Sequence, residues 1–134
     1  MSGYSRTPLA KKLSLKHGML VWWDGVPDSV REEIAAGSLQ LQLLDRPDAP
    51  IDAAHIFVTS RGELEAKLNQ LMPLLEPAGV IWVSWPKRSS KVPTDITEDV
   101  IRDICLPMGL VDVKVCAVDD IWSGLKLVIR KEHR

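Results

Sequence analysis

The sequence predicts an α/β fold with a mostly parallel, six-stranded sheet, helices on both faces and a C-terminal antiparallel β-hairpin. Apolar runs of strand length alternate along the chain with segments of helical periodicity, as in the βαβ units of parallel sheets. Such units join their strands by right-handed crossovers. The last two apolar runs, 110–118 and 124–131, are separated by a short polar turn, and this spacing indicates an antiparallel pair.

The composition fits a single domain over residues 1–134. Of the 134 residues, 46% are hydrophobic and 26% are charged, which is ordinary for a globular chain that buries its own core. The 17 basic and 18 acidic side chains give a net charge of -1, so no broad electrostatic field attracts nucleic acid or an anionic membrane. We therefore expect neither as a partner.

Cysteine usage and the opening residues predict the compartment. Cys105 and Cys116 form no CxxC pair, which argues against a zinc site or a disulfide framework and fits a reducing compartment. The opening residues are polar and basic, unlike a signal peptide. No apolar run approaches the roughly 20 residues of a membrane span. These features predict a cytoplasmic protein.

A helical arm over residues 1–18 is expected to precede the first strand. Thr7 is placed to cap a short helix whose first residue is Pro8, a position where proline's missing N–H costs nothing. Leu9 and Leu13 lie four residues apart on one helical face. We expect this face to dock on the body of the domain.

Strands and helices then alternate. The continuous apolar run 19–23 predicts a strand that is covered on both faces. A helix over 28–36 follows, with Ser29 and Glu32 at the spacing of a capping box. Alternating leucines over 39–44 predict a strand nearer the edge of the sheet.

The third strand is expected over 53–59 and the fourth over 80–85. Between them, Ser60 and the glutamate three residues later form a second capping box, which opens a helix to about Leu75. A Pro-Ala-Gly turn at 77–79 is expected to end this unit.

A basic loop over 86–93 is predicted to follow the fourth strand. It leads to a helix that Asp95 caps, with Glu98 at the matching third position. The final hairpin is expected to turn at 119–123, where two consecutive aspartates are better explained by the turn than by a paired-carboxylate site.

The order of elements resembles the class I methyltransferase fold, a Rossmann-like sheet that ends in an antiparallel hairpin. The stretch Leu74–Val83 (LLEPAGVIWV) is similar to that family's L-x-P-G-G-x-L approach to a later strand. The resemblance runs from about Leu15 onward. It implies a crevice for S-adenosylmethionine, with Asp45 in the place of the acidic residue that holds the cofactor ribose.

Two departures separate the chain from that family. Methyltransferases carry a glycine-rich loop after the first strand, where the backbone approaches the cofactor closely. Residues 23–27 (Trp-Asp-Gly-Val-Pro) hold one glycine and one proline instead. The chain is also one strand–helix unit short at its beginning. These departures predict that no cofactor is retained, and S-adenosylmethionine stands as the alternative.

A second resemblance covers nearly the full length. The stretch Gly3–Leu13 (GYSRTPLAKKL), together with Trp85–Lys87 and Lys114–Asp119, resembles a bacterial protein family of unknown function. It implies the same fold and a bacterial origin, and it brings no activity with it.

Ligands of open parallel sheets bind outside the carboxyl ends of the strands, where the strand order reverses. In a methyltransferase-like topology that point lies between the first and third strands, beside Asp24, Gly25, Thr59 and Ser60. The free N–H groups of the helix that Ser60 opens are suited to hold an anion. The alternative is that Thr59 and Ser60 only cap and Asp24 only turns, and capping is the commoner role of such residues.

The loop after the fourth strand is the most unusual segment. Trp85 supplies an aromatic face, and Lys87, Arg88 and Lys91 supply three cations, with serines between them. This set favours binding of a phosphate, a carboxylate or a nucleotide. The alternative is a solvated loop whose charges serve solubility. A P-loop is excluded, because the sequence has no GxxxxGK[ST] motif.

Other reactive side chains favour structural roles. Cys116 alternates with Lys114, which would activate a thiol, but a buried and inert cysteine is the commoner case. His55 lies in an apolar strand, where a satisfied buried histidine is favoured over a catalytic base. Trp122 lies near a strand end, where it would line a pocket, line an interface or cover the rim of the core.

The resulting hypothesis is a non-catalytic or regulatory domain that binds a small anionic ligand or a protein partner. The alternative enzyme is a reduced S-adenosylmethionine-dependent methyltransferase, and a third reading is a structural homodimer formed through an edge strand or the aromatic rim. The residues expected to bind the ligand are Asp24, Gly25, Thr59, Ser60, Trp85, Lys87, Lys91 and Trp122.

Overall fold

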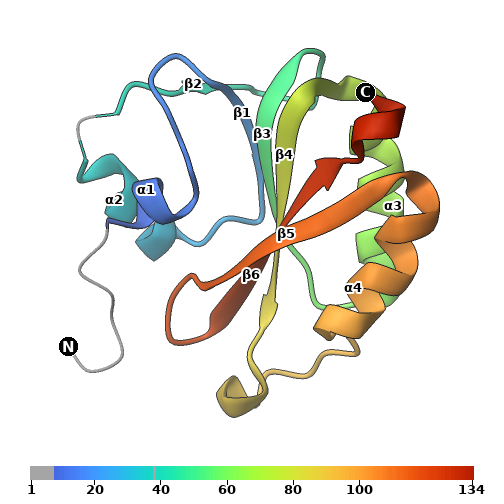
Figure 1. Ribbon diagram of the computed structural model, residues 1–134. Coiled ribbons are helices and arrows are strands. Elements are labelled where there is room, and N and C mark those ends of the chain that lie inside the picture. Colours follow the sequence, from blue (N-terminus) through green and yellow to red (C-terminus); the bar gives the residue numbers. More distant parts are fainter. Residues whose placement is uncertain (1–7, 38) are drawn as a thin grey trace.

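Six strands form one sheet in the order β2-β1-β3-β4-β6-β5 (Figure 1). The structure is a computed structural model that describes residues 8–37 and 39–134. The strands β1 to β4 run parallel to one another. The strand β6 runs antiparallel to both β4 and β5. The strands are β1 (Leu20–Asp24), β2 (Gln42–Leu43), β3 (Ile51–Phe57), β4 (Leu75–Pro86), β5 (Leu110–Ala117) and β6 (Trp122–Ile129).

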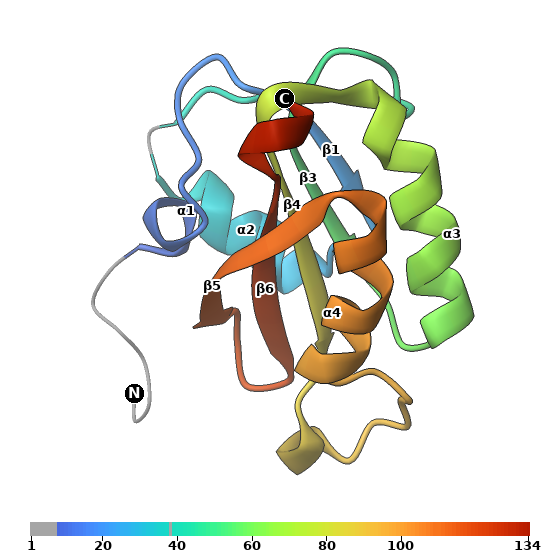
Figure 2. The same cartoon turned by 45° about the vertical axis from the view of Figure 1, so that its right-hand side comes forward.

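The helices lie in two layers, one on each face of the sheet. In Figures 1 and 2, α1 and α2 cover one face, and α3 and α4 cover the other. This arrangement confirms the predicted α/β class with helices on both faces and a C-terminal hairpin. The helices are α1 (Leu9–Lys12), α2 (Asp28–Ala35), α3 (Arg61–Leu71) and α4 (Glu98–Cys105).

The two central strands, β3 and β4, are buried on both faces. Such burial was predicted for the run 19–23, but in β1 Val21 alone is buried and the other four residues are partly exposed. Every residue of β3 from Ala53 to Phe57 is buried, and so is β4 from Ile81 onward. Because successive side chains point to opposite faces, alternate residues enter different cores. Ile56 and Val83 pack with α3 and α4, whereas Phe57 and Trp82 pack with α1 and α2.

The predicted docking of the N-terminal helix is confirmed. Leu9 and Leu13 are 2% and 1% exposed and join the core on the α1–α2 face. The indole Nε1 of Trp82 donates a hydrogen bond of 3.0 Å to the carbonyl of Leu13. Pro8 stands one residue before the helix, in extended conformation, rather than at its first position. The expected capping residue Thr7 lies outside the described residues.

Two predicted helix caps are wrong. In α2 the capping position belongs to Pro27, whose side chain accepts no hydrogen bond, so Ser29 lies inside the helix rather than at its start. In α4 the cap is Thr97, whose hydroxyl accepts from the N–H of Val100 at 3.2 Å. Asp95 was the predicted cap, but its carboxylate bonds elsewhere. Asp95 and Thr97 both lie just before α4, and spacing alone does not show which of them caps the helix.

The strand β4 begins at Leu75, five residues earlier than predicted, so the turn expected at 77–79 lies within the strand. Leu75 pairs with Ile51 and Val80 pairs with Ala53, so β4 carries extra residues opposite a short step of β3. A Cβ on Gly79 would lie 3.0 Å from the carbonyl of Ile51. This close approach explains why a glycine stands in the irregularity.

The edges of the sheet are partly as predicted. β2 is an edge strand, but it comprises two residues rather than the predicted 39–44. The hairpin between β5 and β6 forms as expected, and Asp119 holds its turn by accepting from the N–H groups of Ile121 and Trp122, both at 2.8 Å.

On one side of β1 the sheet has one strand where the Rossmann-type order has two, and this is not the place where a unit was predicted to be missing. Sheets of that type follow the strand order 3-2-1-4-5-6. Within the described ranges, the sheet ends at β2 on that side, so the missing strand is the one that would follow β2 along the chain. The shortfall is therefore internal rather than at the beginning.

A polar pair is enclosed in the centre of the sheet. The Nε2 of His55 on β3 lies 2.7 Å from the Oγ of Ser84 on β4, and both residues are buried. The ring of Phe57 stacks on the imidazole, with 4.5 Å between ring centroids. Burial lowers the pKa of His55 to about 3. The histidine is a satisfied, neutral core residue, in agreement with the favoured interpretation.

The buried histidine predicts a loss of stability in acid. The unfolded chain takes up a proton on His55 below its ordinary pKa of 6.5, and the folded chain resists protonation down to about pH 3. Between about pH 7 and pH 5 this difference removes roughly 2 kcal/mol from the free energy of unfolding. Urea denaturation at both pH values measures it.

The matched variants are His55→Gln and, as a control, His133→Gln in the exposed C-terminal turn. The first should show a smaller difference in unfolding free energy between the two pH values, and the second should behave as the wild type. Equal pH dependence in the wild type and His55→Gln would contradict the assignment.

Candidate functional site

The strand order reverses between β1 and β3, which makes this edge the expected ligand crevice. Asp24 ends β1, and Gly25 turns the chain with a φ of 73°. A Cβ on Gly25 would lie 3.4 Å from the carbonyl of Phe57, at the end of β3. The structure therefore places Asp24 and Gly25 beside the end of β3, which leads into Thr59 and Ser60.

The acidic group at this edge is already paired. The Oδ2 of Asp24 lies 3.0 Å from the Nζ of Lys67 on α3, and the same ammonium lies 3.4 Å from the carboxylate of Glu63. The Lys67 and Asp24 side chains are 21% and 32% exposed. Sequence reasoning missed Lys67, whose only local signal was its spacing of four residues from Glu63. The ion pair links the end of β1 to α3.

The start of α3 is also satisfied by the chain itself. The Oγ of Ser60 accepts from the N–H of Glu63 at 3.2 Å, and Glu63 accepts from the N–H of Thr59 at 3.1 Å. The carboxylate of Asp95 accepts from the N–H of Arg61 at 2.7 Å. Ser60 is thus a capping residue. Asp95 occupies the position at which an external anion would meet the helix.

The loop after β4 lies over this helix start and opens a cleft on its other side. The hydroxyl of Thr94 donates to the carbonyl of Thr59 at 2.7 Å, which fixes the loop to the end of β3. A cleft of about 490 Å³, called here the β4 cleft, lies between the loop and α4. Its lining comprises Trp85, Pro86, Arg88, Lys91, Val92, Pro93, Thr94, Ile96, Thr97 and Glu98.

The β4 cleft combines an apolar floor with free cations. Trp85 and Ile96 are buried, at 8% and 3% exposed. Arg88 and Lys91 are exposed, and in the described part of the chain no carboxylate lies within 4.0 Å of either. The one acidic lining residue, Glu98, pairs with Arg102 at 2.9 Å. Such a cleft is suited to a carboxylate or a phosphate.

The loop holds its cations in a fixed frame. The Oγ of Ser90 donates to the carbonyl of Lys87 at 2.6 Å and accepts from the N–H of Val92 at 3.2 Å. Lys91 takes a left-handed conformation, with φ at 62°. These bonds close a compact turn between Arg88 and Lys91.

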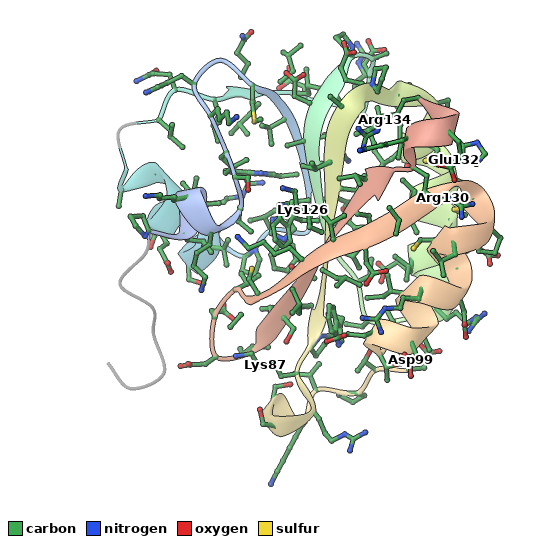
Figure 3. All side chains as sticks on the ribbon, in the orientation of Figure 1. Lys87, Asp99, Lys126, Arg130, Glu132 and Arg134 are labelled. Atoms are coloured by element: carbon green, nitrogen blue, oxygen red, sulfur yellow. The ribbon has the colours of Figure 1, made fainter. Side chains whose placement is uncertain are left out.

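Of the eight predicted binding residues, Trp85 and Lys91 line the β4 cleft and the other six do not. The N–H of Lys87 donates to the carbonyl of Ile121 at 2.7 Å, and Figure 3 shows its side chain beside the β5–β6 turn. Trp122 packs edge-on against Phe57, with 5.0 Å between ring centroids, on the α1–α2 face. Trp85 belongs to the core of the opposite face. The predicted residues therefore fall into separate groups rather than one pocket.

The cysteines and the acidic residues give no reactive centre. Burial raises the pKa of the Cys116 thiol, although Lys12 and Lys114 act in the opposite direction. Burial also raises the pKa of Cys105 to about 11. Neither thiol is activated for nucleophilic attack. Among the described residues, no cluster of three or more histidine, cysteine or carboxylate side chains is arranged to hold a metal ion. None of their helices has the length and apolar character to span a membrane.

Solved structures similar to this chain are methyltransferases and related proteins. A S-adenosylmethionine-dependent methyltransferase from Aquifex aeolicus has 18% identity and a TM-score of 0.60, over 90% of this chain and 88% of that one. A ribosomal protein L11 methylase from Lactobacillus delbrueckii subsp. bulgaricus has 13% identity and a TM-score of 0.57, over 91% and 75%. At these identities the likeness shows a shared fold.

A third similar structure is LepI in complex with S-adenosylmethionine, with 8% identity and a TM-score of 0.56. The match covers 92% of this chain and 47% of LepI, so the chain spans about half the length of that protein. The comparison with curated proteins finds no match.

The sequence also matches a family model over residues 10–131, which takes in every strand and almost all of α1. The description of that model is "Protein of unknown function (DUF3052)". The fold expected from the two resemblances is thus found in a chain that belongs to the DUF3052 family.

Proposed function

We propose that this domain binds a small anionic ligand in the β4 cleft and does so without catalysing a reaction. The observation that carries the proposal is the pair of unpaired cations, Arg88 and Lys91, above the apolar floor of Trp85 and Ile96. A carboxylate or phosphate would accept charge-assisted hydrogen bonds from the two cations. The body of the ligand would cover the indole and the isoleucine.

The conformation of the loop supports this proposal. Because Ser90 fixes the turn between Arg88 and Lys91, little ordering of the backbone is needed when a ligand enters. Guanidinium and ammonium groups are also complementary as donors: Arg88 offers a planar fork, and Lys91 offers a compact charge. A protein partner that presents a carboxylate would meet the same two groups.

A non-catalytic role is supported by the placement of the reactive side chains. Ser84 and His55 lie within hydrogen-bond distance, as a nucleophile and a base would, but both are enclosed in the sheet. Burial holds the imidazole neutral and raises the pKa of both thiols.

The second candidate function is that of a reduced S-adenosylmethionine-dependent methyltransferase. The fold that the chain shares with such enzymes favours it. At the reversal of strand order, however, Asp24 is paired with Lys67, and Gly25 is the one glycine between β1 and α2. The loop ends in Pro27, which caps α2 without a free side-chain acceptor. These features support loss of the cofactor.

Removing the two cations of the β4 cleft should weaken ligand binding. We expect Arg88→Gln/Lys91→Gln to weaken binding of phosphorylated metabolites or dicarboxylates by about tenfold or more, because two charge-assisted contacts are removed. A thermal-shift panel finds the ligand: one present at a hundred times its Kd stabilises by about 2.7 kcal/mol, or several degrees. Calorimetry then compares the variants.

The control is Arg46→Gln/Lys131→Gln, which removes the same charge from exposed positions away from the cleft. It should bind as the wild type does. Equal loss in both double variants would show that net charge, rather than the β4 cleft, governs binding.

S-adenosylmethionine should not bind. Calorimetric titration of the wild type with S-adenosylmethionine and its demethylated product is expected to give no saturable heat, because Asp24, where the strand order reverses, is already paired with Lys67. A Kd of about 10 μM or tighter that is lost in Gly25→Val would reverse the order of the two functions.

A further inference from the structure

Lysines from three separate segments gather on the face of the sheet that α1 covers. Lys114 on β5 and Lys126 on β6 are direct cross-strand partners. Lys12 ends α1, and Lys16 lies between α1 and β1. Figure 3 shows Lys126 directed toward the chain that follows α1. These four residues are called here the lysine cluster.

Three lysines of the cluster, Lys12, Lys114 and Lys126, contact neutral oxygen atoms. The Nζ of Lys12 donates to the carbonyl of Ala117 at 2.8 Å, and the Nζ of Lys114 lies 3.3 Å from the carbonyl of Lys12. The Nζ of Lys126 lies 3.4 Å from the Oγ of Ser14. Over residues 8–37 and 39–134, no carboxylate comes within 4.0 Å of these four ammonium groups. Their positive charge is uncompensated.

Such a cluster is unfavourable for the isolated fold. Like charges directly opposite each other on neighbouring strands destabilise a sheet. Partial burial lowers the pKa of Lys126, and the charges of Lys114 and Lys16 lower it further. The sequence holds 18 acidic residues that are available in principle for pairing, yet none of those described lies here. A bound anion would remove the repulsion.

An apolar hollow adjoins the cluster. It has a volume of about 530 Å³ and shares two residues with the cluster and its contacts, Lys16 and Ser14. The remaining wall comes from α1 and from the chain after α2. The other lining residues are Pro8, Ala10, Lys11, Leu15, Gly37 and Leu39.

We infer that Lys16, Lys114, Lys126 and the hydroxyl of Ser14 bind the phosphate of a phosphate ester whose apolar part lies in the hollow beside α1. Phosphate carries more charge than a carboxylate and offers several acceptor oxygens, which suits convergent ammonium groups and one hydroxyl. The site lies on the opposite face of the sheet from the β4 cleft, since Lys126 pairs with Trp82 of the α1–α2 core.

A small ligand fits this surface better than a nucleic acid does. Nucleic acids need a basic stripe that neutralises many phosphates, and proteins that bind them carry a marked positive charge. This chain has a net charge of -1 and a local cluster of four lysines. The hollow also gives the apolar part of a small ligand a place to bind.

The first experiment titrates the full chain with inorganic pyrophosphate by calorimetry at low salt. We expect Lys114→Gln/Lys126→Met to bind pyrophosphate about tenfold more weakly than the wild type, or worse. The control Arg46→Gln/Lys131→Gln removes the same charge from exposed positions that line neither the β4 cleft nor the hollow, and it should bind as the wild type. No pyrophosphate binding to the wild type, or a loss confined to the control, would overturn the inference.

The second experiment separates binding from a merely structural role. Without ligand, Lys114→Gln/Lys126→Met should melt at the same temperature as the wild type or higher, because repulsion is relieved. A folded variant with a lower melting temperature would assign these lysines to holding α1 and overturn the inference. Lysine-selective NMR adds a direct readout, since pyrophosphate should raise the pKa of Lys126. An unchanged titration would contradict the site.

A single-stranded oligonucleotide completes the design. We expect it to bind more weakly than a phosphate ester with an apolar tail does. Tighter binding of the oligonucleotide that is reduced by Lys114→Gln/Lys126→Met would assign the surface to a polyanion and overturn the small-ligand inference.

Discussion

The central strands β3 and β4 are buried on both faces, and the positions of the other elements follow from this constraint. A strand pair without contact to water needs an apolar layer on each side. On one side α3 and α4 provide it, and on the other α2 and the short α1 do. The polar groups that remain between the layers must satisfy one another, as His55 and Ser84 do. Chemistry that needs water or charge is therefore displaced to the ends and margins of the sheet.

The charged side chains at those margins differ in whether they are paired within the protein. Where the strand order reverses, Asp24 pairs with Lys67, and Asp95 accepts from the N–H of Arg61 at the start of α3. At the β4 cleft and in the lysine cluster, no carboxylate of the described residues lies within 4.0 Å of the cations. These unpaired cations of the described residues therefore lie away from the reversal of strand order.

Much of the fold is predictable from the sequence because buried apolar residues recur at the spacing typical of strands and helices. The run at 19–23 has no polar residue, which predicted a strand covered on both faces, and the run at 80–85, with a single serine, predicted a strand; the leucine stripe predicted α3. Helix caps are less predictable. Asp95 and Thr97 are both good capping residues, but the carboxylate of Asp95 accepts instead from the backbone N–H of Arg61, which is distant in sequence. The site is harder still. Asp24 and Lys67 are far apart in sequence, and the lysine cluster depends on the register of β5 with β6, which composition does not encode.

The place of α1 bears on what the lysine cluster is for. A helix of four residues has little stability of its own and is held by tertiary contacts. Leu9 and Leu13 are buried, and Trp82 donates to the carbonyl of Leu13, so apolar packing and one neutral hydrogen bond already secure the helix. Four positive charges add repulsion to an arrangement that does not require them. Because Lys114 and Lys126 also contact Lys12 and Ser14, an anion that drew these ammonium groups together would change how α1 is held. Binding of the proposed ligand would therefore be coupled to the position of the N-terminal helix through these lysine contacts.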